Sequence, residues 1–379
     1  MILSLAQRGY FCAMDELSKL RNQIDEIDLQ ILRLLNERAR LAKAVGDIKK
    51  SMGLEVHSPE REQEVFSRLS KLNKELFNES FPTQALRYVY REIMSACLSL
   101  EEVIKVAYLG PRATFTHQAS LEFFGLSAKY VAVGTIEDVF KEVELSRADY
   151  GVVPIENTTE GVVNFTLDRF LQTELKIVGE VVIPIRLNLL SRSSEINNIE
   201  AVFSHRHAIA QCREWLSKNL PNVKIFEAES TARACEIASE SQSVGAIASE
   251  AAAHVYHLNI LSRNIQDNPD NYTRFIVVGK RAVGPTGKDK TTIAFALKDQ
   301  TGALYRALEC FYEEQINLTR IVSRPNSKRV WDYIFFVDFE GHFKEEHVER
   351  VIHKLKERAQ MVKVLGSYPM APLKEGKGL

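Results

Sequence analysis

The sequence predicts a multidomain protein: an all-α block at the N-terminus, a two-lobed α/β block in the middle and a small α+β block at the C-terminus. Three patterns carry this prediction. Up to about residue 102, apolar residues recur at steps of three and four, the period of helices with one buried face. Between residues 104 and 280, short apolar runs alternate with helical stretches, as in α/β folds. From residue 290 onwards the expected elements follow the order βαββαβ.

The first block begins with an expected helix from Asp15 to Lys50, which no proline interrupts. At 1.5 Å per residue it would be ~50 Å long, which exceeds the width of a hundred-residue globule. One face of it carries an apolar stripe made of Leu17, Leu20, Ile24, Ile27, Ile31, Leu34, Leu41, Val45 and Ile48. Such a helix needs partners along its length, so we expect an intertwined helical dimer or a longer bundle.

Arg38 stands in this stripe where an apolar residue is expected, and Lys49 projects from nearly the same side, at an offset of ~20°. An isolated Arg in such a position usually extends its charged end to water. Two cations on a buried face are costly unless an anion meets them, so the pair favours a site for an anionic ligand. Arg21 lies ~100° around the helix from Arg38, so one helix cannot aim both at one ligand. If both serve one site, Arg21 must come from a second subunit.

Two more helices complete the block. Ser58 suits an N-cap and Pro59 the first position of a helix over Pro59–Leu76. A third helix, Thr83–Glu102, is expected to bury Ala85, Val89, Ile93, Ala96 and Leu100. The leader over residues 1–13 has an apolar stretch too short and broken for a secretory signal, and we expect a disordered tail or an artefact of the chosen start site.

This block closely resembles the all-helical chorismate mutases over residues 17–102, and we expect a domain over residues 14–102. The resemblance is carried by Leu20-Arg21, Glu37-Arg38, Lys49, Pro59-Glu60-Arg61-Glu62 and Glu101. It implies that Arg38, Lys49 and the partner subunit's Arg21 bind the two carboxylates and the ether oxygen of chorismate. It also implies that Glu62 binds the ring hydroxyl and that Arg61 supports the site.

A Claisen rearrangement of this kind needs no nucleophile, metal or cofactor. It needs a dianionic substrate held in a chair-like conformation, with donors at the ether oxygen where negative charge grows. Glu101 can donate to that oxygen only when it is protonated, and burial raises a carboxyl pKa above its reference value of about 4.3. We therefore expect Glu101 to be a catalytic group whose contribution falls as the pH rises.

The middle block, expected over residues 104–280, contains eight strand-like runs. They are 104–109, 150–154, 176–184, 187–190, 201–203, 224–227, 244–248 and 274–278. Two consecutive strands at 176–190, followed by a new βα series, indicate that the chain crosses to a second lobe near Pro184. It is expected to return near residues 264–275, which leaves a cleft between two lobes.

Polar loops follow several of these strands, where ligand sites of α/β folds form. They are Gly110–Thr116, Pro154–Thr158, Ser204-His205 and Asp267–Phe275, and each alone fits ordinary turn chemistry equally well. Together, Pro154-Ile-Glu-Asn157, Ser204-His205 with Gln211, Glu229-Ser-Thr231 and Asn271-Tyr-Thr-Arg-Phe275 resemble the prephenate dehydratases, from about Val106 to Gly279. The resemblance implies a two-lobed, periplasmic-binding-protein-like fold.

It further implies that Thr273 is the catalytic hydroxyl and that Arg274 holds the segment or a substrate carboxylate. The supporting polar residues would be Asn157, Ser204, Gln211 and Glu229. Prephenate loses CO₂ and water together, so the enzyme must protonate the departing hydroxyl. A threonine is no strong acid, so we expect Thr273 to position or relay a proton, with His205 either contributing or facing solvent. The sequence departs from the family at Arg206-His207 and at Ala113, where Gly is frequent, which bears on local loop geometry.

After a linker over residues 281–290, the last block is expected to form a ferredoxin-like fold over residues 290–370. Its strands are expected at 291–297, 317–323, 330–339 and 362–368, with helices at 302–314 and 344–359. Gly302-Ala-Leu-Tyr305 and Ser323-Arg324-Pro325 resemble the phenylalanine-binding ACT domain of dehydratases, although Val322 stands where Glu is usual. The effector residues implied are Gly302, Ala303, Leu304, Asn317, Leu318, Ser323 and Arg324, at the junction of two such domains.

Bulk composition excludes other classes of function. With 49 basic and 50 acidic residues the net charge is −1, so nothing suggests nucleic-acid or membrane binding. The five cysteines lack CxxC or metal-like spacing, which favours a reducing cytoplasm and no metal site.

The order of blocks predicts a bifunctional enzyme of phenylalanine biosynthesis, homodimeric or larger and free of cofactors. It would convert chorismate to prephenate and then to phenylpyruvate, with feedback inhibition by phenylalanine. The alternatives are an arogenate dehydratase, whose substrate carries an amine in place of the keto group, and a non-catalytic amino-acid-sensing module.

Overall fold

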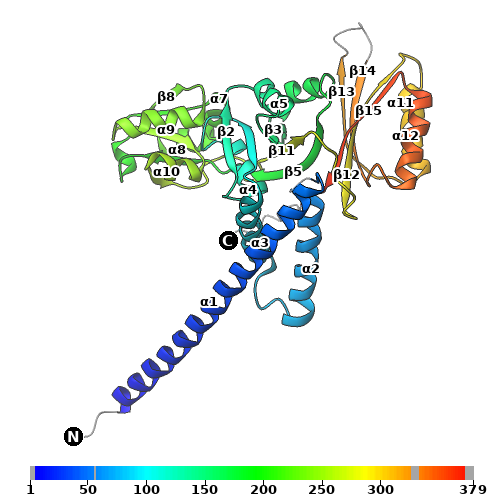
Figure 1. Ribbon diagram of the computed structural model, residues 1–379. Helices are drawn as coiled ribbons and strands as arrows, with labels where there is room; N and C mark the ends of the chain where they lie inside the picture. The colour runs from blue at the N-terminus through cyan, green and yellow to red at the C-terminus, as the bar shows by residue number, and fades with distance from the viewer. Residues whose placement is uncertain (1–4, 55–56, 326–332, 372–379) are drawn as a thin grey trace.

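The computed structural model describes residues 5–54, 57–325 and 333–371. Figure 1 shows the three expected blocks in chain order: helices, a two-lobed α/β body and a final block with two helices on its outer face. The last strand of the final block contacts the strand over Lys176–Pro184, at the edge of the first lobe's sheet, and this contact joins the two blocks.

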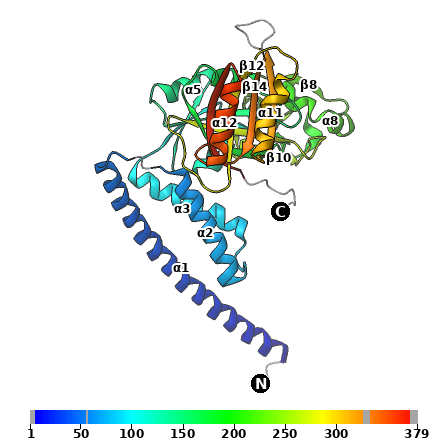
Figure 2. The same ribbon diagram turned by 90° about the vertical axis from the view of Figure 1, so that its right-hand side faces the viewer.

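The helical block consists of α1 (Leu5–Ser51), α2 (Pro59–Phe77) and α3 (Thr83–Glu101). Ser58 caps α2 as expected, since its hydroxyl accepts from the Arg61 amide. At 47 residues α1 is ~70 Å long and begins upstream of the expected Asp15. Figures 1 and 2 show α1 projecting away from the rest of the molecule, with only its C-terminal part beside α3.

The apolar stripe of α1 is not buried within the single chain. Its nine members, Leu17, Leu20, Ile24, Ile27, Ile31, Leu34, Leu41, Val45 and Ile48, are all exposed. The expected buried series of α3 is wrong: Val89 and Leu100 are exposed, and Met94, Ser95 and Cys97 are buried instead. The reason is a contact with the next block, where the Ser95 hydroxyl donates to the Phe124 carbonyl at 2.7 Å.

The first lobe of the middle block is a six-stranded sheet of order β2-β1-β3-β11-β5, with β4 beside β3. Its strands are β1 (Lys105–Leu109), β2 (Lys129–Val133), β3 (Tyr150–Asn157), β4 (Gly161–Val162), β5 (Lys176–Pro184) and β11 (Tyr272–Gly279). Its helices are α4 (Phe115–Phe124), α5 (Ile136–Glu144) and α6 (Asn164–Phe170). The strands β2 and β4 were not expected.

The second lobe is a five-stranded sheet of order β10-β6-β9-β7-β8. Its strands are β6 (Asn188–Ser191), β7 (Ala201–Ser204), β8 (Lys224–Glu227), β9 (Val244–Ala248) and β10 (Asn259–Ser262), of which β10 was not expected. Its helices are α7 (Arg206–Ala210), α8 (Arg213–Asn219), α9 (Thr231–Glu240) and α10 (Glu250–Tyr256), with a 3₁₀ turn at Ile196–Asn198. The chain enters this lobe after β5 and returns in β11, so the predicted crossing is confirmed.

The final block has the expected βαββαβ order. It consists of β12 (Asp289–Leu297), α11 (Ala303–Glu313), β13 (Leu318–Pro325), β14 (Tyr333–Glu340), α12 (Glu346–Arg358) and β15 (Met361–Pro369), in a sheet of order β13-β14-β12-β15. The start of the strand expected at residues 330–339 lies outside the described residues. Helices α11 and α12 pack on one face of this sheet.

The other face of that sheet packs on the first lobe. One hydrophobic core contains Phe140, Ile155 and Ile276 of the lobe together with Phe336 and Leu365 of the final block. Gly366 in β15 lies so close to β5 that a Cβ atom there would be 2.2 Å from the Ile177 carbonyl oxygen. The two blocks are therefore joined by a shared core rather than by a flexible tether.

Candidate functional site

Glu101, Arg38 and Lys49 come together where α3 crosses α1. Glu101 packs on Gly46, where a Cβ atom would lie 2.8 Å from the Glu101 side chain. Oε2 of Glu101 is buried and has no hydrogen-bond partner among the described residues. Burial raises the pKa of Glu101 above its usual value, although Lys49, Lys50 and Arg38 oppose the shift. A carboxyl with one buried oxygen that makes no hydrogen bond, close to cations, is a suitable donor to an anionic ligand.

The other expected residues of this site are not assembled within one chain. Arg21 is exposed and lies seventeen residues from Arg38 on α1, or ~25 Å along the helix. Arg61 is exposed and pairs with Glu64 at 2.6 Å. Glu62 lies 3.3 Å from Nε2 of His57, a residue that the sequence did not indicate.

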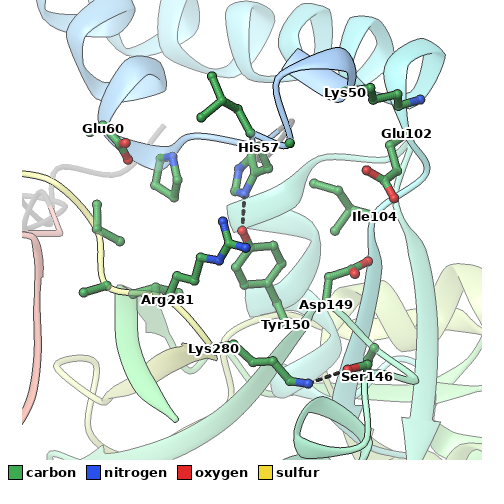
Figure 3. A pocket seen from close by; sticks show the side chains of 17 residues that line it. Lys50, His57, Glu60, Glu102, Ile104, Ser146, Asp149, Tyr150, Lys280 and Arg281 are labelled. Atoms are coloured by element: carbon green, nitrogen blue, oxygen red, sulfur yellow. Dashed lines mark hydrogen bonds between the residues drawn. The ribbon is translucent and has the colours of Figure 1, made fainter. Parts of the chain in front are cut away.

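His57 belongs to a cavity of about 460 Å³ between the helical block and the first lobe. Its Nδ1 lies 2.9 Å from the Tyr150 hydroxyl, as Figure 3 shows. Lys280 and Arg281, just after β11, also line this cavity (Figure 3). Thr273 is not among the lining residues, so this cavity is separate from the expected dehydratase site.

Thr273 and Asn157 face each other on β11 and β3, at one end of these two neighbouring strands. They are cross-strand partners, and the Asn157 amide donates to the Thr273 hydroxyl at 2.8 Å and to the Asn271 side chain at 2.9 Å. Thr273 is buried, with 8 % of its surface exposed. The Asn157 side-chain oxygen accepts from the amides of Thr159 and Glu160, so the orientation of this amide is fixed at both ends.

Thr273, Asn157 and Asn271 thus begin a chain of hydrogen-bonded side chains, the polar chain, which continues into the second lobe. Asn271 donates to the Gln211 side chain at 2.8 Å, and Gln211 donates to Glu160 at 3.0 Å. Gln211 follows α7 of the second lobe, whereas Asn271 immediately precedes β11 of the first. Asn271 was missing from the expected site, although its place two residues before Thr273 puts both on one side of an extended chain.

Two histidines border this chain at the start of α7. His205 stacks on His207 with ring centroids 4.9 Å apart, and His207 lies 2.9 Å from Glu160. The pKa of His205 lies below its usual value, mainly because of burial and then because of the nearby His207. His205 is therefore neutral near pH 7, which makes it a suitable proton acceptor rather than a permanent cation.

Ser204 and Glu229 stand apart from the polar chain. The Ser204 hydroxyl is fully buried and donates to the Ile247 carbonyl at 2.6 Å. Glu229 is exposed at the end of the loop after β8. Ala113, where Gly is frequent in the family, has a φ of +69°, so the loop keeps the left-handed conformation despite its side chain.

Arg274 does not point towards Thr273. Its guanidinium donates to Glu180 at 2.7 Å, to Asp338 at 2.5 Å and to the Tyr368 hydroxyl at 2.8 Å, all on the side of the final block. Neighbouring residues of a strand face opposite sides, so Arg274 cannot share the face of Thr273. Of its two expected roles, a contact to a substrate carboxylate does not fit, and holding the segment does.

The expected effector residues occupy separate ends of the final block. Gly302 caps α11 with a φ of +76°. Asn317 follows the other end of that helix, ~16 Å away along its axis, and donates to Glu340 at 3.0 Å. Arg324, near the far end of β13, donates to Asp168 of the first lobe at 2.8 Å. One chain therefore does not gather the seven residues around one ligand.

Other features concern ligands and compartments. Among the described residues, no helix is long and apolar enough to cross a membrane, and no group of three or more His, Cys, Asp or Glu could hold a metal ion. Cys97, Cys212, Cys235 and Cys310 are free and buried.

Three protein-family models match the chain in order: chorismate mutase type II over residues 20–102, prephenate dehydratase over 106–283 and the ACT domain over 291–357. A bifunctional chorismate mutase/prephenate dehydratase of Aquifex aeolicus is 63 % identical over 96 % of this chain and its own whole length. One from Neisseria gonorrhoeae is 43 % identical over 93 % of this chain and 97 % of its own. A prephenate dehydratase of Arthrobacter aurescens, solved in complex with L-Phe, is 34 % identical, with a TM-score of 0.65 over 70 % of this chain and 90 % of its own.

Proposed function

The chain belongs to the family of bifunctional chorismate mutase/prephenate dehydratases, and we propose from this premise where its two reactions take place. It rearranges chorismate to prephenate and converts prephenate to phenylpyruvate, under feedback control by phenylalanine. We assign the mutase to residues 14–102, the dehydratase to residues 104–280 and the regulatory ACT domain to residues 290–370. The polar chain from Thr273 to Gln211, which crosses from one lobe to the other, is the observation that best supports the dehydratase assignment.

In the proposed mutase site, Arg38 and Lys49 bind the carboxylates of chorismate and Glu101 donates to its ether oxygen. The support is the unpaired, buried Oε2 of Glu101 beside both cations. The dianion brings negative charge to Arg38 and Lys49, and this charge further favours the protonated form of Glu101. Glu62 is assigned to the ring hydroxyl and Arg61 to a supporting position.

We propose that the mutase is a homodimer whose sites contain Arg21 of the partner subunit. The exposed apolar stripe of α1 needs a cover, and a second copy of the same helix offers a matching stripe. Arg21 is too far from Arg38 in its own chain to share a ligand with it. A partner helix running in the opposite direction would bring Arg21 to the site.

Hybrid dimers test this arrangement. Arg21→Ala and Arg38→Ala should each abolish mutase turnover, but co-expression of the two should restore about a quarter of the wild-type rate. Half of the dimers are then hybrids, and each hybrid contains one intact site. No recovery on mixing would mean that both residues act within one chain, and full activity of Arg21→Ala alone would remove Arg21 from the site.

In the proposed dehydratase site, prephenate lies in the cleft against Thr273, with Asn157 orienting the hydroxyl. Asn157 binds the Thr273 oxygen as a donor, so the hydroxyl proton is free to point at the substrate. That proton can be donated to the departing hydroxyl of prephenate, while the hydrogen bond between Gln211 and Asn271 holds the two lobes together. Ser204 and Glu229 would act in the closed cleft, and neutral His205 would take up a proton from solvent and pass it to the network.

Phenylalanine is assigned to the junction of two ACT domains. The support is the separation of Gly302–Leu304 from Asn317–Leu318 within one chain, because two chains side by side can bring one end of each together. Ser323 and Arg324 would border the same junction. The free, buried cysteines Cys97, Cys212, Cys235 and Cys310 suit a reducing compartment, so we propose a cytoplasmic location, which fractionation of cells would test.

A further inference from the structure

The strand pair that carries Asn157 and Thr273 has a second, opposite face. Thr273 pairs with Asn157 across the strands, and the next pair in register is Arg274 with Glu156. Since neighbouring side chains alternate between faces, Arg274 and Glu156 lie directly behind the two residues assigned to the dehydratase site. A shift of Arg274 and Glu156 therefore also shifts the backbone of their neighbours Thr273 and Asn157.

Glu156 and Arg274 both contact residues of the ACT domain. Arg274 donates to Asp338 of β14 at 2.5 Å, and Glu156 lies 2.8 Å from Nε of Arg320 in β13. Arg320 and Asp338 are themselves cross-strand partners in the ACT sheet. Two adjacent residues of the dehydratase site strands therefore meet two paired residues of the regulatory sheet.

Three of the four charged side chains are largely buried and Glu156 is 34 % exposed, so the charges act most strongly around Asp338. The side chain of Asp338 has no exposed surface, and those of Arg274 and Arg320 are 11 % and 8 % exposed. Burial alone would raise the pKa of Asp338, but the charges of Arg274 and Arg320 outweigh burial and hold it below its usual value. Asp338 also accepts from Thr292, and Glu180 accepts from Arg274 and Lys290, so the network on the Arg274 side is fully bonded.

The Arg320 side of the network is different. Although Nε lies 2.8 Å from Glu156, no nitrogen of its guanidinium makes an aligned hydrogen bond to any described residue. An ion pair whose buried cation makes no aligned hydrogen bond is costly, and its geometry is easily changed. It suits a contact that changes geometry when the edge strand β13 shifts, and β13 also carries residues assigned to the effector site.

We propose that Glu156 and Arg274 are positioning residues for the dehydratase reaction, held from behind by Arg320 and Asp338 of the ACT domain. This inference rests on the proposed dehydratase site at Thr273. It means that the ACT domain sustains the basal rate and that phenylalanine inhibits by displacing the Arg320–Glu156 pair. Arg320, and not Arg274, is the residue that responds to the effector, because its guanidinium makes no aligned hydrogen bond to any described residue.

A competing explanation is that these ion pairs only fasten one domain to the other. The chain offers a matched control, because Arg324 on the same strand β13 donates to Asp168 at 2.8 Å. Asp168 lies on α6 of the first lobe and is not a residue of β3 or β11. Asp168→Asn thus breaks a contact between the same two domains without touching the strand pair of the site.

The experiment compares Arg320→Met, Glu156→Gln, their double variant and Asp168→Asn in the full-length enzyme, with prephenate as substrate. We expect Arg320→Met and Glu156→Gln to lower kcat about ten- to a hundredfold with little change in KM, since misplacement of a catalytic group acts on the chemical step. The double variant should lose no more than either single one. Arg320→Lys should regain part of the rate, and Arg320→Met should weaken inhibition by phenylalanine.

Mutase turnover should stay normal in all of these variants, because the mutase occupies another domain, and an unchanged circular dichroism spectrum shows that the whole protein is folded. The inference is overturned if Arg320→Met has the same kcat as Asp168→Asn, or if the losses of the two single variants multiply in the double one. Thr273→Val separates this result from the site assignment. If Thr273→Val keeps its rate, the site is wrong; if it is inactive while Arg320→Met is normal, the site stands and the positioning role fails.

Discussion

Replacing Thr273 by Val removes one hydroxyl from the proposed dehydratase site and keeps the shape of the side chain. Thr273 is 8 % exposed and its hydroxyl receives one bond, from Asn157 at 2.8 Å. Asn157 keeps its bonds to Asn271 and to the Tyr272 carbonyl, so no buried donor is left unpaired. The loss of stability should therefore be about 1 kcal/mol, or ~2–4 °C in Tm.

The loss of rate should be much larger. A positioned proton donor contributes about 10²–10⁴-fold, which corresponds to about 3–5 kcal/mol of barrier. We expect the formation of phenylpyruvate from prephenate, followed by its ultraviolet absorbance in alkali, to fall by that factor. The mutase rate should not change, because Thr273 lies in another domain.

Thr166→Val is the matched control. Thr166 is fully buried on α6 and its hydroxyl donates to the Pro154 carbonyl at 2.6 Å, outside the polar chain of the cleft. It should lose at least as much stability and keep the dehydratase rate. A Thr273→Val enzyme within about threefold of wild type, or a Thr166→Val enzyme equally inactive, would refute the reasoning.

Three further predictions concern the other two domains. The mutase rate should fall towards alkaline pH, because burial raises the pKa of Glu101 and only its protonated form donates. Glu101→Gln should flatten this pH profile, and equal slopes for the two proteins would reject the role of Glu101. Arg38→Ala should abolish mutase turnover while the dehydratase continues to work, and a joint loss in folded protein would mean that the two sites are not separate. Gly302→Trp should remove the heat of phenylalanine binding in calorimetry, and unchanged binding would exclude this end of α11.

The sequence predicted those helices and strands whose buried face follows from the spacing of their own apolar residues. The long apolar strands and the βαββαβ order of the last block are of this kind, because a hydrophobic run needs no knowledge of its neighbours. It missed β2 and β10, which are edge strands with partly exposed side chains and no continuous apolar run. It also chose the wrong face of α3, because the contact of Ser95 with the next domain, and not the helix period, decides which side is buried.

The site residues divide in the same manner. Thr273, Asn157 and Gln211 could be grouped from sequence through the resemblance to the prephenate dehydratases, and the structure links all three by hydrogen bonds through Asn271. Arg274 was grouped with them by its place in the motif, whereas strand alternation already puts it on the opposite face. The partners of Arg274 and Glu156 come from strands more than sixty residues away or from another domain, and no local pattern indicates such contacts.

The central claim is that one chain performs two consecutive reactions at two separate sites. The direct measurement is to add chorismate alone to the purified protein and to follow the products by mass over time. The account predicts that prephenate appears first and that phenylpyruvate then accumulates, with phenylalanine suppressing the second product. Accumulation of prephenate without phenylpyruvate, or no consumption of chorismate at all, would contradict it.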